Sequence, residues 1–209
     1  MYNVPHFKEY DDSLIYEFMK AHPFITLCGC TKDNLPVATH IPVLFEEKDN
    51  KLFLLGHAMR KQQHTTAFEN NNNVLAIFTG AHTYVSASWY ETKNVASTWN
   101  YQTVHARGTL RFMNDEQLYS LLENLTKKFE NDPDSPAQVK HLDKKYIESN
   151  MKAIIGFYIE IISIEHVAKL SQNRDKKSFE NIVEHLQTQD ADAKKIAAEM
   201  LKRKEQIFK

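Results

Sequence analysis

A cluster of basic and imidazole side chains follows an apolar run in the first third of the chain. Directly after KLFLLG, the stretch GHAMRKQQHTT (56–66) contains His57, Arg60, Lys61 and His64. A helix that starts in solvent favours Asp or Glu in its first turn, because the helix dipole is positive there. Basic side chains suit that end when an anion binds to it, since free N–H groups, Arg and Lys together hold a phosphate. The stretch therefore predicts a phosphate site in a first helical turn, with a solvated basic helix start as the alternative.

The segment VATHIP places polar side chains on a predicted strand that contains a proline. Thr39 and His40 precede Pro42, and this strand is expected to pair with the one that ends at His57. Proline interrupts strand hydrogen bonding, so main-chain groups beside it remain available to a cofactor ring. The alternative is that both side chains simply face solvent.

Two later segments combine aromatic, amide and basic groups. STWNYQTVH brings Trp99 and Asn100 together, and KLSQNRDKK carries Gln172 and Arg174 directly after an apolar strand. Aromatic faces and amide groups in one run suit a planar polar ligand. The alternatives are an interface or core role for the first segment and a capped helix start for the second.

Several other site classes lack their residues. No two of the five glycines are close enough for a nucleotide-binding glycine loop, and no hydrolase or metalloprotease motif occurs. Cys28 and Cys30 share one face of a predicted strand, but a zinc site needs two such pairs, so no metal site is predicted. The net charge of −1 and pI of about 6.8 do not support a nucleic-acid-binding surface. With no secretory signal and no membrane-length apolar run, a cytoplasmic protein is expected.

The hydrophobic periodicity predicts strands separated by inserted helices. Asp11 or Asp12 is expected to cap a helix that buries Leu14, Ile15 and Phe18. The other predicted helices span residues 60–69, 114–129 and 142–150, with a charged helical tail, and the predicted strands span 23–31, 37–47, 51–57, 74–80, 99–113 and 152–167. The last strand is β-branched and expected at the centre of the sheet. Six or seven successive strands favour a mainly β fold with helical additions, a closed antiparallel barrel, over a β-α-β sheet.

The candidate segments together resemble one known family. ATHIP, GHAMR, SASWY, STWNY, KAIIGFYIEI and KLSQNR occur in the order of the PaiB-like family, described as FMN-binding negative transcriptional regulators. The resemblance covers residues 1–180 and implies a split antiparallel β-barrel similar to that of pyridoxamine phosphate oxidases. It further implies a homodimer with FMN at the subunit interface. Residues 181–209 are then expected to form a C-terminal helical extension.

The resemblance also implies roles for individual residues. Arg60 and Lys61 would bind the FMN phosphate, with His57 close to it. The isoalloxazine ring would lie along Thr39, His40 and Ile41, partly through main-chain groups. The remaining ligands would come in part from the partner subunit and are Trp99, Asn100, Lys169, Gln172 and Arg174. No catalytic residue and no metal ligand is assigned.

Three functional hypotheses follow from this resemblance. The first is a cytoplasmic FMN-binding regulator that represses transcription directly or through a partner; DNA binding rests on the family and not on the charge pattern. The second is a flavin-dependent oxidoreductase or flavin reductase, in which FMN carries the electron chemistry. The third is a haem-binding split barrel, for which the phosphate-facing basic pair has no evident use.

Overall fold

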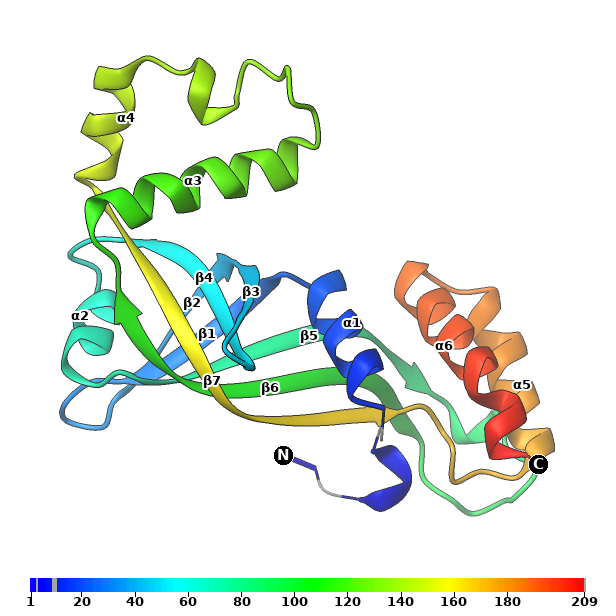
Figure 1. Ribbon diagram of the computed structural model, residues 1–209. Helices are drawn as coiled ribbons and strands as arrows, with labels where there is room; N and C mark the ends of the chain where they lie inside the picture. The colour runs from blue at the N-terminus through cyan, green and yellow to red at the C-terminus, as the bar shows by residue number, and fades with distance from the viewer. Residues whose placement is uncertain (3, 9–10, 209) are drawn as a thin grey trace. The chain divides into compact units, whose positions relative to one another are not determined.

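The chain forms two compact units, and the computed structural model describes residues 1–2, 4–8 and 11–208 (Figure 1). The first unit comprises Met1–His22, Phe78–His105 and Glu165–Lys209, and the second comprises Pro23–Ile77 and Ala106–Ile164. Three long strands, β5, β6 and β7, begin in one unit and end in the other. Each unit therefore combines a part of the sheet with its own helices.

The elements alternate in sequence much as the periodicity predicts. The strands are β1 (Phe24–Cys30), β2 (Pro36–Pro42), β3 (Leu44–Lys48), β4 (Lys51–Met59), β5 (Asn73–Val85), β6 (Thr98–Phe112) and β7 (Ile154–Lys169). The α-helices are α1 (Asp12–Ala21), α2 (Gln63–Asn70), α3 (Asp115–Glu130), α4 (Lys144–Met151), α5 (Lys176–Gln187) and α6 (Ala191–Ile207). Short 3₁₀ turns are η1 (Pro5–Phe7), η2 (Ala87–Trp89) and η3 (Val139–His141). The predicted extension boundary at residue 181 falls inside α5.

The strands form a seven-stranded sheet in the order β2-β1-β5-β6-β7-β4-β3. The β1–β2, β1–β5, β3–β4 and β4–β7 pairs are antiparallel. Asp49 and Asn50 both have positive φ between β3 and β4, which is the two-residue turn that matches the twist of a hairpin. β2 lies at a sheet edge, so the strand hydrogen bonds that Pro42 cannot make cost little. The predicted mainly antiparallel β fold with helical additions is confirmed.

In the second unit, α2 and α3 pack apolar side chains against the strands. α2 packs against β1 and β2, and its Phe68 ring occupies the space in which Gly29 lacks a side chain. Leu118, Leu121 and Leu125 of α3 form a buried stripe against β3 and β4 residues. Asn114 caps α3 with a reciprocal bond to Gln117, as its sequence predicts.

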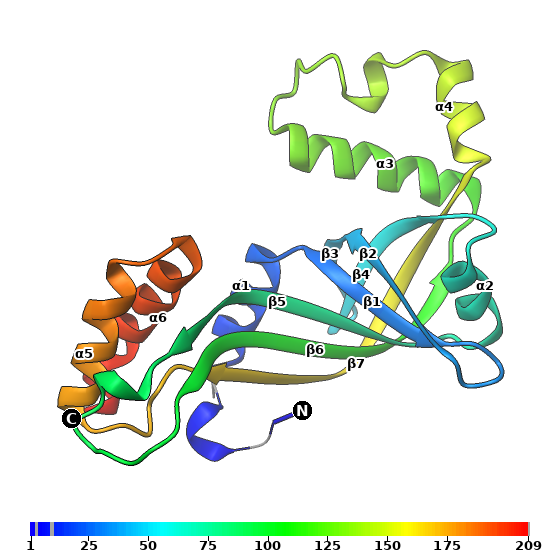
Figure 2. The same cartoon turned by 180° about the vertical axis from the view of Figure 1, so that it is seen from behind.

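In the first unit, α5 and α6 pack side by side and build a separate apolar core (Figure 2). Phe179, Ile182 and Leu186 of α5 meet Ile196 and Met200 of α6 in this core. The core also includes side chains at or next to the ends of β5 and β7, so the C-terminal helices stabilise this part of the sheet.

Three details of the sequence prediction differ in the structure. Asp11 caps α1, but the buried residues of this helix are Ile15 and Met19, while Leu14 is exposed. Phe129 at the end of α3 is also exposed. The central strand is β6, and β7 lies next to it, so the prediction that β7 occupies the centre was wrong by one strand.

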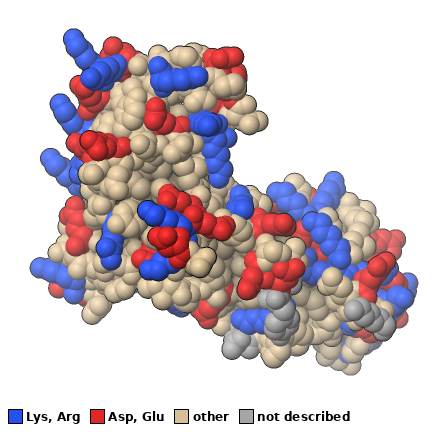
Figure 3. Space-filling view, in the orientation of Figure 1, with Lys and Arg blue, Asp and Glu red and all other residues tan. Residues whose placement is uncertain are grey.

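Charged side chains of both signs are interspersed on the face shown in Figure 3. Lys51 pairs with Glu160 in the second unit, and Lys204 pairs with Glu180 in the first. Among the described residues, no helix is long and apolar enough to cross a membrane.

Candidate functional site

The predicted phosphate residues lie in a turn between β4 and α2. The backbone N–H of Arg60 donates to the Ala153 carbonyl at 2.8 Å, and Lys61 adopts a left-handed backbone with φ of 60°. The Thr65 hydroxyl in α2 donates to the Met59 carbonyl at 2.7 Å and ties the helix start to the strand end. The helix begins at Gln63, so the prediction that Arg60 and Lys61 belong to its first turn was wrong. They lie in the turn that precedes the helix.

The start of α2 differs from that of every other α-helix in the described part of the chain. α1, α3, α4, α5 and α6 each have an Asp or Asn side chain that accepts a bond from a first-turn N–H. The N-cap residue of α2, Gln62, makes no such bond, and its first turn contains no acidic residue. Its first N–H groups thus lack the side-chain acceptor that the other helices have, next to two basic residues.

His57 on β4 contains a buried polar atom without a partner. Its Nδ1 is shielded from solvent and makes no hydrogen bond in the described structure. Burial also lowers the pKa of this imidazole, so its neutral form is favoured. A buried polar atom without a partner is uncommon and points to a group that the protein chain does not supply.

The lowered pKa of His57 predicts acid-sensitive folding. On acidification below about pH 6.5 the unfolded histidine takes up a proton, whereas the buried folded one resists it, so folding stability falls. Burial also lowers the pKa of His64, so this residue adds to the loss of folding stability in acid. Urea unfolding at about pH 7.5 and about pH 5.5 should show a smaller loss of stability in His57→Gln than in the wild type. An equal loss of folding stability in both proteins would contradict the assignment of this acid sensitivity to His57.

The β2 residues present their side chains to different environments. Ile41 is buried, Thr39 is half-buried and His40 is exposed beside Phe24, with ring centroids 6.3 Å apart. The Ile41 Cγ2 atom lies 3.2 Å from the position that a Cβ on Gly56 would occupy. β2 and β4 therefore approach each other closely at Gly56, the residue before His57, and this brings the two predicted segments of the second unit together.

In the first unit, Trp99 lies on an exposed aromatic surface. Its side chain is 52% exposed and its ring is 6.1 Å from His82 and 6.0 Å from Tyr84 on β5. An exposed group of large rings is a frequent feature of binding surfaces.

Asn100 is a fully buried polar residue that organises the turn after β7. Its amide oxygen accepts from the Ser171 hydroxyl at 3.0 Å, and its amide nitrogen lies 3.6 Å from the Met200 sulfur. Ser171 has a φ of 61°, so this bond holds a left-handed turn in place. Asn100 thus joins β6, the turn after β7, and α6.

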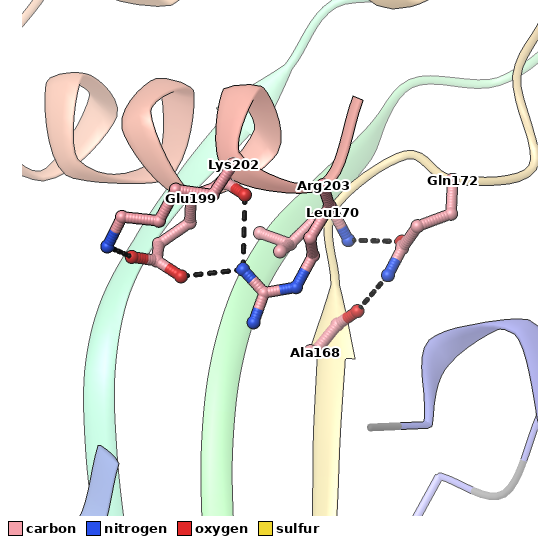
Figure 4. Close-up of polar contacts among 6 residues, drawn as sticks. All are labelled: Ala168, Leu170, Gln172, Glu199, Lys202 and Arg203. Atoms are coloured by element: carbon pink, nitrogen blue, oxygen red, sulfur yellow. Dashed lines mark hydrogen bonds and ion pairs between the residues drawn. The ribbon is translucent and has the colours of Figure 1, made fainter. Parts of the chain in front are cut away.

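Gln172 braces the same turn (Figure 4). Its amide nitrogen donates to the Ala168 carbonyl at 2.5 Å, and its amide oxygen accepts from the Leu170 N–H at 2.7 Å. Both ends of the amide bond to the backbone of its own loop. Gln172 therefore positions its neighbours in the chain.

Lys169 and Arg174 line a cavity of about 320 Å³ in the first unit. The Lys169 ammonium donates to the Thr98 hydroxyl, and the Arg174 guanidinium lies 4.2 Å from the Tyr90 ring centroid. Asn100 also lines this cavity, whereas Trp99 and Gln172 are not among its lining residues. Three of the predicted site residues of this unit are thereby brought together.

Sequence analysis missed the N-terminal wall of this cavity. Tyr2, His6 and Phe7 line it together with Ser171 and Asn173. The only available signal was the aromatic content of MYNVPHF, and nothing in that stretch indicates which distant segment it covers.

Comparison with other sequences shows relatives over almost the whole chain. Residues 1–163 match the family described as "Putative FMN-binding domain". The Bacillus subtilis (strain 168) protein named "Protease synthase and sporulation protein PAI 2" is 35% identical over 204 residues, which cover 98% of both chains. This alignment extends into the segment predicted as a C-terminal extension.

Comparison with solved structures shows the fold. The FAD and haem binding protein from Mycobacterium smegmatis has a TM-score of 0.56 at 16% identity, over 77% of this chain and 72% of that one. A conserved hypothetical protein from Mycobacterium tuberculosis has a TM-score of 0.54 at 13% identity, over 81% and 91%. At such low identity the agreement shows a shared split antiparallel β-barrel fold.

Proposed function

The chain belongs to the PaiB-like family of FMN-binding proteins, and from this premise we propose that it is an FMN-dependent negative regulator of transcription. Its cofactor is FMN. The name of the B. subtilis relative links that protein to protease production and sporulation, which supports a regulatory role here. Membership of the family extends over residues 1–163, which contain both the β2–β4 segments and the start of β6.

The observation that carries the cofactor site is the uncapped start of α2 behind a basic turn. Arg60 and Lys61 supply two positive charges, and α2 supplies N–H groups without a side-chain acceptor. A phosphate monoester accepts several such bonds at once. The unpartnered Nδ1 of His57 on the adjoining strand is a further sign that a bound group completes this region.

The other predicted residues are given roles that fit their surroundings. Thr39, His40 and Ile41 offer edge-strand main-chain groups along the isoalloxazine ring. Trp99 offers an exposed ring face, while Lys169 and Arg174 offer cationic donors. Asn100 and Gln172 are positioning residues, because their amides hold the turn that carries these cations. When bound, FMN supplies one- or two-electron transfer; the chain binds and orients it.

The protein acts as a cytoplasmic homodimer in this proposal, with residues of the partner subunit completing the FMN site. Support comes from the exposed aromatic surface of Trp99 and Tyr84 in the first unit and from exposed Phe24 in the second. Large apolar side chains of this kind are commonly covered in an assembly.

Repression through a protein partner fits the surface better than direct contact with DNA. The net charge is −1, and the charges on the face in Figure 3 alternate in sign. A DNA-binding surface needs a basic stripe that neutralises several phosphates.

The visible absorption spectrum of the purified protein, with and without added FMN, tests the proposal. A flavin spectrum with one FMN per subunit is the expected result. Absence of both bound pigment and FMN binding would overturn the cofactor site, and a haem band would favour the haem alternative. The FMN-loaded protein then separates regulator from enzyme: steady oxidation of a reduced nicotinamide favours a flavin reductase, whereas repression of a reporter promoter supports the regulator.

A further inference from the structure

The cavity in the first unit contains two cations that pair with no carboxylate of the described residues. Lys169 and Arg174 both line it, and none of the described residues that line it is acidic. These cations contact the Thr98 hydroxyl and aromatic rings. Partly buried cations normally have an anionic partner, because desolvation without one is costly.

Three cations of α6 in the same unit have a carboxylate partner. Arg203, only 17% exposed at its side chain, bonds to the Glu199 carboxylate at 2.6 Å, and Lys202 shares that carboxylate (Figure 4). Lys204 pairs with Glu180. Lys169 and Arg174 differ from these three, because no carboxylate of the described residues pairs with them.

The opposite wall of the cavity is aromatic. The rings of Tyr2 and Phe7 are stacked with centroids 5.8 Å apart, and they lie 5.9 and 6.0 Å from the Lys169 ammonium. Lys8 donates to the His166 carbonyl at 3.3 Å and anchors this segment to β7. Aromatic faces opposite two cations suit a molecule with a planar body and an anionic end.

We propose that this cavity binds a compact single-ring organic carboxylate, with its carboxylate at Lys169 and Arg174 and its ring against Tyr2 and Phe7. A volume of about 320 Å³ is at the lower end of small-molecule sites, which favours a single ring. A bare inorganic anion would use the cations but leave the aromatic wall without a role. The amide group of Asn173, which also lines the cavity, is available to orient the ligand.

The charge state of the cavity supports the same ligand class. Burial lowers the pKa of the Lys169 ammonium, and the positive charge of Arg174 lowers it further. A carboxylate between the two cations would remove that mutual repulsion and favour the charged lysine.

The inference rests on the proposed function in one respect, since it specifies what Lys169 and Arg174 recognise within the FMN site. FMN itself is held mainly through its phosphate at Arg60 and Lys61. The two ligands therefore depend on different residues, and their binding can be measured separately.

Ligand-observed NMR on the FMN-loaded protein tests this directly. Benzoate is the probe, and benzamide is its uncharged control. Benzoate should bind in the millimolar range or tighter, and Lys169→Met and Arg174→Gln should each weaken it about tenfold or more. Lys177→Gln, which removes an exposed charge from the start of α5, should leave binding unchanged. Tyr2→Ala should weaken benzoate several-fold and inorganic phosphate not at all.

The outcomes distinguish the two proposals. Loss of benzoate binding in the two cavity variants, with FMN affinity changed much less, supports the carboxylate site. Loss of FMN binding with unchanged benzoate binding in Arg174→Gln would overturn it, because the cation would then be an FMN ligand only. Binding of benzamide as well as benzoate, or no benzoate binding to the wild type, would also overturn it. A wild type that binds benzoate but not FMN would overturn the FMN site and leave the carboxylate site in the cavity unaffected. Thermal melts check that each variant is folded.

Discussion

Replacing Arg60 and Lys61 together by glutamine is expected to weaken FMN binding by about a hundredfold or more, while the protein stays folded. Each charge-assisted contact to a phosphate contributes about 1.5–3 kcal/mol, and about 1.4 kcal/mol corresponds to a factor of ten. Glutamine keeps a polar side chain of similar reach and removes only the charge. The turn should persist, because the Arg60 N–H bond to Ala153 and the Thr65 bond to Met59 do not involve the replaced side chains.

Titration of the apoprotein with FMN, followed by quenching of flavin fluorescence, measures this effect. Lys127→Gln is the matched control, since Lys127 is an exposed cation on α3 of the same unit. Riboflavin, which lacks the phosphate, should bind the wild type and the double variant equally weakly. Retained FMN affinity in the double variant would show that the FMN phosphate binds at other residues. Parallel loss in the Lys127 control would indicate a general charge effect, which added salt would reveal.

Gly108→Ala is expected to reduce the free energy of unfolding by about 3 kcal/mol. A Cβ on residue 108 would collide with the main-chain oxygen of Glu160 and would lie 2.6 Å from the Ile159 Cγ2 atom. Both obstacles belong to β7, the neighbour of β6 in the sheet, so the strands themselves must move. A loss of about 3 kcal/mol is a large fraction of the 5–15 kcal/mol that typically separates folded from unfolded states.

Urea unfolding of Gly108→Ala and Gly80→Ala provides the comparison. At Gly80 the obstacle is the Phe18 ring, at 2.8 Å, which can rotate aside because it is the end of a side chain. The loss at Gly80 should therefore be no more than about 1 kcal/mol. Equal losses at the two positions would show that the strands yield as easily as the ring.

Local patterns in the sequence predicted most elements of this fold. The caps at Asp11 and Asn114 and the hairpin turn at Asp49 and Asn50 each depend on residues near in sequence. Such features are dictated by backbone sterics and by hydrogen bonds within a few residues. They could therefore be predicted without knowledge of the tertiary structure.

The start of α2 could not be predicted in the same way. The residues from Arg60 to Gln62 have ordinary helix-forming side chains, yet the Arg60 N–H bonds to Ala153 on a distant segment. That bond keeps Arg60 and Lys61 out of the helix and leaves them in the turn before it. A long-range contact overrode a local preference, which is a common cause of misplaced element boundaries.

The sequence by itself determined the antiparallel β fold and the family, and it predicted the FMN-binding segments, because periodicity, turn residues and motif order are local properties of the chain. Only the tertiary structure decided which of those residues meet. It joined Tyr2 and Phe7 to Lys169 and Arg174, and it committed the amides of Asn100 and Gln172 to bracing a turn. The physical reason is that the partner of a buried polar group, and the wall of a cavity, are set by contacts between segments far apart in sequence.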